Sequence, residues 1–228
     1  MMKRIIQWMT LFTLLLTLTA CSSAENTTVQ ATEQPAVQTV SESSENGKIL
    51  IAYFSVTETD GVDTVASASR VATDNGVVGN TQFVANVIAE ATGGDLWRIE
   101  TVQAYPETHE PLLDFAYNEL LTNARPELSG KIENLDAYDV VFLGYPTWDA
   151  ELPMPLYSFL ESYDLSGKTI IPFNTHGGSR FADTIQTIAE LQPNAEVVKN
   201  GFTVSRNTVS SSENDILAWL NGLGYTKK

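Results

Sequence analysis

Two short motifs, each directly after an apolar run, hold the residue types best suited to binding a flat ligand. Tyr145-Pro146-Thr147-Trp148 follows the run 140–144, and Thr175-His176-Gly177-Gly178 follows the run 169–173. Short runs rich in β-branched and aromatic residues are typical of buried parallel strands. In an open α/β sheet, ligands bind just past the carboxyl ends of such strands. Aromatic rings on one side and closely approaching glycine backbone on the other suit a heterocycle with polar edges, and a flavin is the first candidate.

A third group of polar residues follows the first expected strand, 48–54. Ser55 and Thr57 supply hydroxyls at that strand end, and Gly79-Asn80-Thr81 stands where the next helix should begin, with the Asn or the Thr as its cap. The free N–H groups and dipole of a helix N-terminus favour a phosphate. Neither GxxxxGK[ST] nor GxGxxG follows the strand, which argues against nucleoside triphosphates and dinucleotides bound in their usual mode. A plain helix start is the alternative interpretation of 79–81.

Strands and helices alternate along the rest of the chain. The patterns predict strands at 48–54, 95–100, 140–144, 169–173 and 202–204, and helices at 81–91, 112–123, 155–163, 181–191 and 214–223. This alternation indicates a parallel, doubly wound sheet with helices on both faces. One domain of ordinary size accommodates it, and we place that domain at 48–228.

The N-terminal segment has the pattern of a lipoprotein signal. Lys3 and Arg4 precede an apolar stretch that is too short for a membrane span, and Leu18-Thr19-Ala20-Cys21 resembles the bacterial lipobox. We expect residues 1–20 to be a signal peptide and Cys21 to be lipidated. An ordinary signal peptide with an incidental cysteine is the alternative. Cys21 is the only cysteine, so the chain has neither an internal disulfide nor a CxxC pair.

Residues 21–47 are expected to form a disordered tether behind the lipidated cysteine. They are polar and small, with almost no aromatic residue to bury in a core. Such a tether would hold the domain on the extracytoplasmic side of the cell membrane by its lipid anchor. The formal net charge of −15 at pH 7 argues against nucleic-acid binding and against docking on anionic lipid. It favours a partner that is basic at its docking face, although solubility alone would also explain it.

Taken together, these segments resemble the flavodoxin family, in a branch with a Tyr-Pro-x-Trp loop and a Thr-His-Gly-Gly loop. The resemblance covers 48–225 and also includes Tyr105-Pro106 and Arg125-Pro126-Glu127-Leu128. It implies a flavodoxin-like α/β fold with a five-stranded parallel sheet of order 2-1-3-4-5, and non-covalent FMN at the strand ends. The residues it implies for phosphate binding are Ser55, Thr57, Asn80 and Thr81. Those implied beside the isoalloxazine are Pro146, Thr147 and Trp148 on one side and Thr175, His176, Gly177 and Gly178 at the other edge. His109 is expected to be solvated in a polar loop.

Two departures from the family pattern carry hypotheses of their own. Residues 58–78 are inserted between Thr57 and Gly79 and show no strong periodicity, and we expect them to fold over the flavin or to contact a partner. Asp149 stands after Trp148, where a glycine often helps a backbone peptide flip. Asp149 should hinder that flip, and its negative charge should lower the flavin's potential for the second electron.

The sequence therefore predicts an FMN-binding electron-transfer protein on the outer face of the membrane, working with a redox partner protein. An electron carrier is favoured over an enzyme that turns over a substrate. One alternative is an NAD(P)H-dependent FMN oxidoreductase that reduces quinones or similar acceptors. Another is a flavin-free, surface-anchored binding or scaffold lipoprotein, because a fold does not by itself guarantee an activity.

Overall fold

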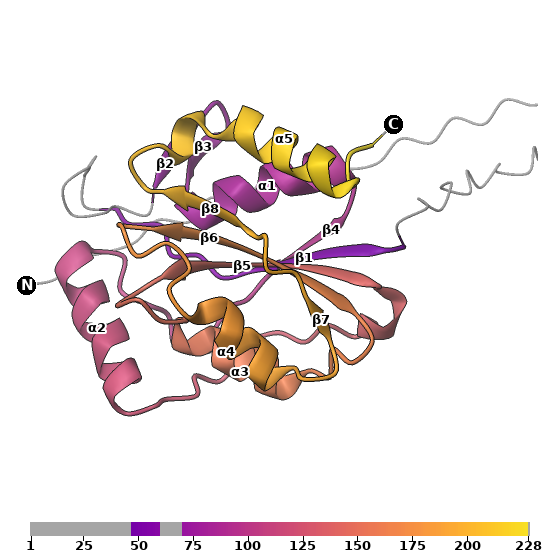
Figure 1. Cartoon of the computed structure of the whole chain (residues 1–228). Coiled ribbons are helices and arrows are strands. Elements are labelled where there is room, and N and C mark those ends of the chain that lie inside the picture. The colour runs from indigo at the N-terminus through magenta and orange to yellow at the C-terminus, as the bar shows by residue number, and fades with distance from the viewer. Residues whose placement is uncertain (1–46, 60–69, 228) are drawn as a thin grey trace, which may run out of the picture. The chain divides into compact units, whose positions relative to one another are not determined.

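A parallel sheet forms the centre of the chain in the computed structural model, which describes residues 47–59 and 70–227 (Figure 1). The strand order is β4-β1-β5-β6, and both β7 and β8 pair with β6. The strands are β1 (Ile49–Tyr53), β4 (Asp95–Arg98), β5 (Val140–Thr147), β6 (Thr169–His176), β7 (Glu196–Val197) and β8 (Phe202–Ser205). The predicted α/β fold and strand order are confirmed. The fifth position is divided, because β7 pairs with the first part of β6 and β8 with its last part.

Helices cover both faces of this sheet. In Figure 1, α1 (Asn80–Thr92) and α5 (Glu213–Leu223) lie on one face, and α3 (Met154–Ser162) and α4 (Thr184–Leu191) lie on the other. The fifth helix, α2 (His109–Leu121), lies beside the carboxyl ends of the strands. Two short 3₁₀ helices lie in connections: η1 (Leu135–Ala137) between α2 and β5, and η2 (Val209–Ser211) between β8 and α5.

The central strands are buried on both faces, which explains why they appear in the sequence as unbroken apolar runs. Along β1, Leu50 packs in the core beneath α3 and α4, whereas Ile49 and Ile51 pack in the core beneath α1 and α5. No residue of β1 is more than 5% exposed. A strand sandwiched in this way cannot slip, and its carboxyl end is held rigidly for the loop that follows.

Three helices begin within one residue of the predicted position, whereas α2 and α4 begin three residues away from it. Helix α2 begins at His109 because Pro111 falls in its first turn, where a missing N–H removes no intrahelical bond. Helix α4 begins only at Thr184, since Arg180 (φ 54°) and Ala182 (φ 46°) have left-handed backbone that interrupts a helix.

A β-hairpin, β2 (Val71–Thr73) with β3 (Gly76–Val78), occupies the second half of the insertion. The sequence pattern predicted no element there, and that was wrong. The missed signal is Asp74-Asn75-Gly76, a run of turn-forming residues between valine-containing segments, in which Asp74 and Asn75 form the turn. Val71 is only 4% exposed and packs in the core beneath α1 and α5, so this part of the insertion is anchored to the domain.

The predicted signal peptide, Cys21 and all but the last residue of the predicted tether lie outside the described residues, as do residues 60–69. Within 47–59 and 70–227, no helix combines the length and the apolar character needed to cross a bilayer.

Candidate functional site

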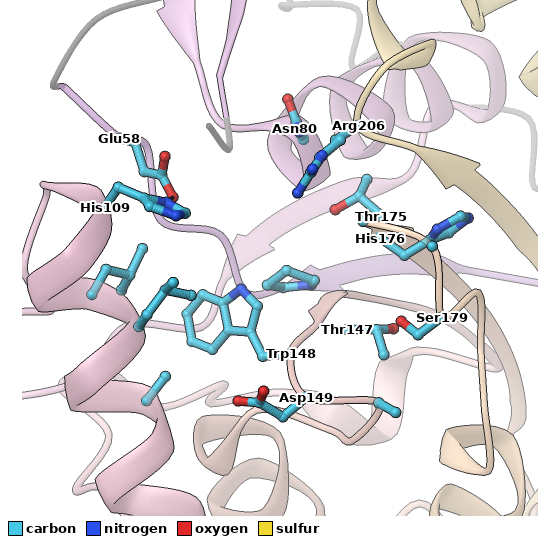
Figure 2. A pocket seen from close by; sticks show the side chains of 17 residues that line it. Glu58, Asn80, His109, Thr147, Trp148, Asp149, Thr175, His176, Ser179 and Arg206 are labelled. Atoms are coloured by element: carbon cyan, nitrogen blue, oxygen red, sulfur yellow. Dashed lines mark hydrogen bonds and ion pairs between the residues drawn. The ribbon is translucent and has the colours of Figure 1, made fainter. Parts of the chain in front are cut away.

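A cavity of about 330 Å³ opens at the carboxyl ends of β5 and β6 and the N-terminus of α1 (Figure 2). Within the sheet, β4 lies next to β1 at one edge of that strand and β5 lies next to it at the other edge. The cavity therefore lies near the point where the strand order reverses. Ligands of open α/β sheets bind at such points. The predicted site residues that line this cavity are Asn80, Pro146, Thr147, Trp148, Thr175, His176, Gly177 and Gly178.

Trp148 is held at the cavity by a tight two-residue turn. Its backbone N–H donates to the Glu151 carbonyl at 3.3 Å, and the Glu151 N–H donates to the Trp148 carbonyl at 2.8 Å. The two residues between them, Asp149 (φ 49°) and Ala150 (φ 61°), both have left-handed backbone. This conformation costs roughly 1–2 kcal/mol per non-glycine residue. The turn is therefore strained, and Asp149 already holds a conformation that a glycine would adopt freely.

The indole of Trp148 packs against two aromatic rings that do not line this cavity. It meets Phe54 edge-on, with ring centroids 5.6 Å apart, and lies tilted against Tyr105 at 5.9 Å. In Figure 2 the ring extends into the cavity between the side chains of its two walls. A half-buried ring supported in this way is a rigid surface for stacking a planar ligand.

The two motif loops are joined by one buried amide. Asn174 is fully buried, and its Nδ2 donates to Thr147 Oγ1 at 2.5 Å and to the Arg180 carbonyl at 2.7 Å. Thr147 ends β5, and Arg180 belongs to the loop after Gly177-Gly178. The Asn174 side chain therefore fixes the spacing between the Trp148 loop and the glycine loop.

His176 forms the end of β6 and lies on the cavity wall opposite Glu58 and His109 (Figure 2). Its Nδ1 is buried and has no hydrogen-bond partner among the described residues. Burial, and to a smaller extent the positive charge of Arg180, hold the pKa of His176 below its ordinary value. The ring is therefore neutral at neutral pH, and can offer a ligand one donor and one acceptor nitrogen.

The predicted phosphate residues meet at the N-terminus of α1. The cap is Gly79, and no side chain among the described residues caps this helix, so the expectation that Asn80 or Thr81 caps it was wrong. A Cβ placed on Gly79 would overlap Ser55 Oγ and lie 3.3 Å from Thr57 Oγ1. The hydroxyls of the first loop therefore reach the helix N-terminus in spite of the insertion between them.

Two predicted contacts differ in detail from this arrangement. Thr81 Oγ1 is hydrogen-bonded to Thr175 Oγ1 at 2.9 Å, so these two hydroxyls join α1 to β6 rather than lying on separate parts of the site. Ser55 and Thr57 line a neighbouring cavity of about 470 Å³ together with Tyr105, and not the cavity of Trp148. A hydrogen bond from β4 fixes the Ser55 loop: Arg98 Nη2 donates to the Ser55 carbonyl at 2.8 Å.

Helix α2 supplies a wall of the cavity that no sequence pattern predicted. His109 is its first residue, only 14% exposed, and its Nδ1 lies 3.2 Å from Oε1 of the buried Glu58, so the expectation of a solvated His109 was wrong. Leu112, Leu113 and Ala116 continue the wall. Leu112 and Leu113 stand three and four residues after His109, and Ala116 stands seven after it, which is the spacing of one helix face. No sequence pattern singled out Glu58, or Arg206, whose backbone N–H donates to the His176 carbonyl at 2.9 Å.

The family model described as Flavodoxin matches residues 48–223. The chain belongs to the flavodoxin family. A solved flavoprotein from Bacteroides eggerthii DSM 20697 is 30% identical, with a TM-score of 0.57, over 78% of this chain and 99% of that one. One from Bacteroides uniformis ATCC 8492 is 25% identical, with a TM-score of 0.58, over the same shares of 78% and 99%.

A third solved structure, of a flavoprotein from Lactobacillus acidophilus NCFM in complex with FMN, is 20% identical with a TM-score of 0.51, over 75% of this chain and 99% of that one. At that identity it shows a shared fold. No curated protein matches the chain. Membership of the flavodoxin family supports FMN as the cofactor of this site, as the sequence predicts.

Proposed function

We propose that this flavodoxin-family protein binds FMN non-covalently and transfers electrons through it. The observation that carries the proposal is the continuity of two half-sites. The cavity lined by Trp148 and Gly177-Gly178 reaches Asn80, and Asn80 follows directly on Gly79, which packs against the Ser55 hydroxyl. A ring site and an anion site joined in this way fit a flavin with a single terminal phosphate.

In this proposal, different residues bind the phosphate and the ring system of FMN. The hydroxyls of Ser55 and Thr57, with the uncapped amides of the first turn of α1, would bind the phosphate. Trp148 would stack on the ring system, and the backbone of Gly177-Gly178 would meet its polar edge. Bound FMN would supply the electron-transfer chemistry, and the protein's part is binding, orientation and tuning.

The electron-transfer partner in this proposal is a protein with a basic docking face. Helix α2 borders the cavity and carries Glu110, Asp114 and Glu119 but no lysine or arginine, which agrees with the overall charge of −15. Charge complementarity of this kind mainly raises the association rate and makes it sensitive to salt. Signal residues 1–20 and a lipidated Cys21 would place this encounter on the outer face of the membrane.

A second candidate is a flavin oxidoreductase that reduces a small organic acceptor with NAD(P)H. The apolar surface of Leu112, Leu113 and Ala116 beside Trp148 favours it, because a planar acceptor could lie there. Stoichiometric consumption of NAD(P)H and a quinone by the FMN-loaded protein would support this candidate. Reduction of a basic protein acceptor without such turnover supports the electron carrier.

The deciding experiment is a titration of the cofactor-free chain with FMN, followed by quenching of flavin fluorescence. We expect one-to-one binding, weakened at least about 5-fold in Trp148→Ala, because an aromatic stacking pair contributes about 1 kcal/mol beyond area burial. Trp219→Phe, on α5 and away from the cavity, is the matched control and should bind like the wild type. Absence of binding would remove the cofactor function and leave the flavin-free binding or scaffold lipoprotein as the remaining interpretation.

A further inference from the structure

An aromatic cluster connects the cofactor cavity with helix α2. Tyr105 is its centre, with ring centroids 5.9 Å from Trp148, 5.2 Å from Phe54 and 5.0 Å from Phe115. Of these four rings, only the indole and the phenol lose an electron readily. The cluster therefore contains one oxidisable pair in direct ring contact, and one member of that pair lines the cavity.

The phenol of Tyr105 ends on a carboxylate. Its O–H donates to Glu119 Oε2, and the residue is only 9% exposed. Burial is the main cause that raises the pKa of both Tyr105 and Glu119. The charged phenolate is thus disfavoured, while the neutral carboxylic acid form of Glu119 is easier to reach than in water. Loss of an electron from Tyr105 then favours simultaneous transfer of its proton to Glu119.

Tyr105 also has an outlet to the surface. It lines the second cavity, of about 470 Å³, together with the exposed residues Ala104 and Glu107. A small reductant or a partner can therefore approach the phenol from this second cavity, without passing Trp148 and Gly177-Gly178. Tyr105 supports the Trp148 ring and lines the cavity of Ser55 and Thr57, but its phenol and its hydrogen bond to Glu119 have no part in the FMN binding proposed above.

We propose that Trp148 and Tyr105 form a relay that carries an oxidising equivalent from the cofactor cavity to the Tyr105–Glu119 pair, where Glu119 takes the phenol proton. The inference rests on the proposed function, since the oxidant is light-excited oxidised flavin. In the first step Trp148 loses one electron to the flavin and becomes a radical cation. In the second, one electron passes from Tyr105 to Trp148 and the phenol proton passes to Glu119 Oε2. Neutral Trp148, a neutral tyrosyl radical and protonated Glu119 result, and the balance of charge is kept.

The test is flash excitation of the full FMN-loaded chain, with transient absorption of the tryptophan and tyrosyl radicals. In the wild type, the tryptophan signal should decay as the tyrosyl signal rises, and more slowly in D₂O. Glu119→Gln keeps a carbonyl that can accept the phenol hydrogen bond but cannot take the proton, so the second step should slow on the order of 100-fold. Tyr105→Phe should abolish the tyrosyl signal and prolong the tryptophan signal.

The matched control is Tyr138→Phe. Tyr138 also donates to a carboxylate, Asp95 Oδ2 at 2.7 Å, but shows no ring contact with Trp148. Its removal should leave the signals unchanged. A tyrosyl signal that persists in Tyr105→Phe, or an unchanged second step in Glu119→Gln, would overturn the relay. FMN binding with normal affinity in those same variants shows that the cofactor proposal is unaffected.

A second arm needs no flavin. Flash-generated tris(bipyridine)ruthenium(III) oxidises the cofactor-free chain, and electron paramagnetic resonance records the trapped radicals. A tyrosyl signal that falls at least about twofold in Tyr105→Phe, but not in Tyr138→Phe, supports the relay even if FMN fails to bind; equal signals in the wild type and Tyr105→Phe count against it.

Discussion

The most direct perturbation of the candidate site is Gly79→Ala, which adds one methyl group where two segments meet. The new Cβ would overlap Ser55 Oγ and lie 3.3 Å from both Thr57 Oγ1 and the Val56 carbonyl. The Ser55 hydroxyl can rotate away, whereas the Val56 carbonyl is backbone and yields little. We therefore expect the fold to survive and the Ser55 hydroxyl to leave the N-terminus of α1.

The cost to stability is moderate. Moving a side chain off its preferred rotamer costs of order 0.5–1.5 kcal/mol, and an alanine at a helix N-cap costs about 1 kcal/mol relative to a good cap. The sum, about 2 kcal/mol, corresponds to a melting temperature roughly 4–8 °C lower for a domain of this size. The loss of one hydrogen bond to a charged phosphate is worth about 1.5–3 kcal/mol, so FMN affinity should fall about 10- to 100-fold.

The assay compares FMN with riboflavin, which has the same ring system but no phosphate. Fluorescence titrations of wild type and Gly79→Ala with both ligands give two dissociation constants for each protein. If Ser55 and the α1 amides bind phosphate, the variant loses most of its preference for FMN, while riboflavin binding changes little. An unchanged ratio of the two constants would refute the assignment of the phosphate site.

The matched control is Gly222→Ala. Gly222 lies in α5, and a Cβ there meets nothing within 4 Å. Because alanine is favoured over glycine in a helix by roughly 0.5–1 kcal/mol, the control should be slightly more stable and bind both ligands normally. A similar loss of FMN affinity in both variants would point to a general effect on the fold.

Three further perturbations test the loops around the cavity. Ala150→Gly should relieve the left-handed strain and stabilise the fold by about 1 kcal/mol, which calorimetry would show as a melting temperature roughly 2–4 °C higher; a decrease would contradict the strained turn. Asn174→Ala removes the donor shared by Thr147 and the Arg180 carbonyl, so urea unfolding should show a loss of about 2–4 kcal/mol, and FMN should bind more weakly. A loss near zero would mean that the two loops hold their spacing unaided. Because the pKa of His176 is lowered in the folded state, the wild type should be fully stable above the ordinary value of 6.5 and lose stability as the pH falls below it, whereas His176→Gln should lose less. Parallel pH–stability curves for the two proteins would exclude this contribution.

The architecture was predictable because each central strand is buried on both faces. Burial of this kind requires an unbroken apolar run, as in Ile49–Tyr53. Such runs alternate with amphipathic helices, so the order of strands and helices can be taken from the sequence. The division of the last strand was not predictable, since β7 has only two residues and no period can be read from two residues. The hairpin after residue 70 was missed because three-residue strands carry little pattern beyond the turn between them.

The candidate site was predictable where its residues directly follow strands. Trp148 and Gly177-Gly178 line the cavity because β5 and β6 end side by side. Glu58 and His109 were not, since their contact joins segments 51 residues apart, and nothing in either segment alone indicates it. The bond between Thr81 and Thr175 escaped for the same reason: it depends on how α1 packs on β6.

The meeting of Ser55 with Gly79 has a consequence for engineering this protein. Ser55 and Gly79 lie against each other although residues 56–78 separate them along the chain. The entropy of closing such a loop grows only with the logarithm of its length, about 0.6 kcal/mol for each doubling. A foreign peptide or a small reporter domain spliced between residues 59 and 70 would leave Glu58 and the Val71 anchor intact, and would stand next to the cofactor cavity without setting the spacing of its parts.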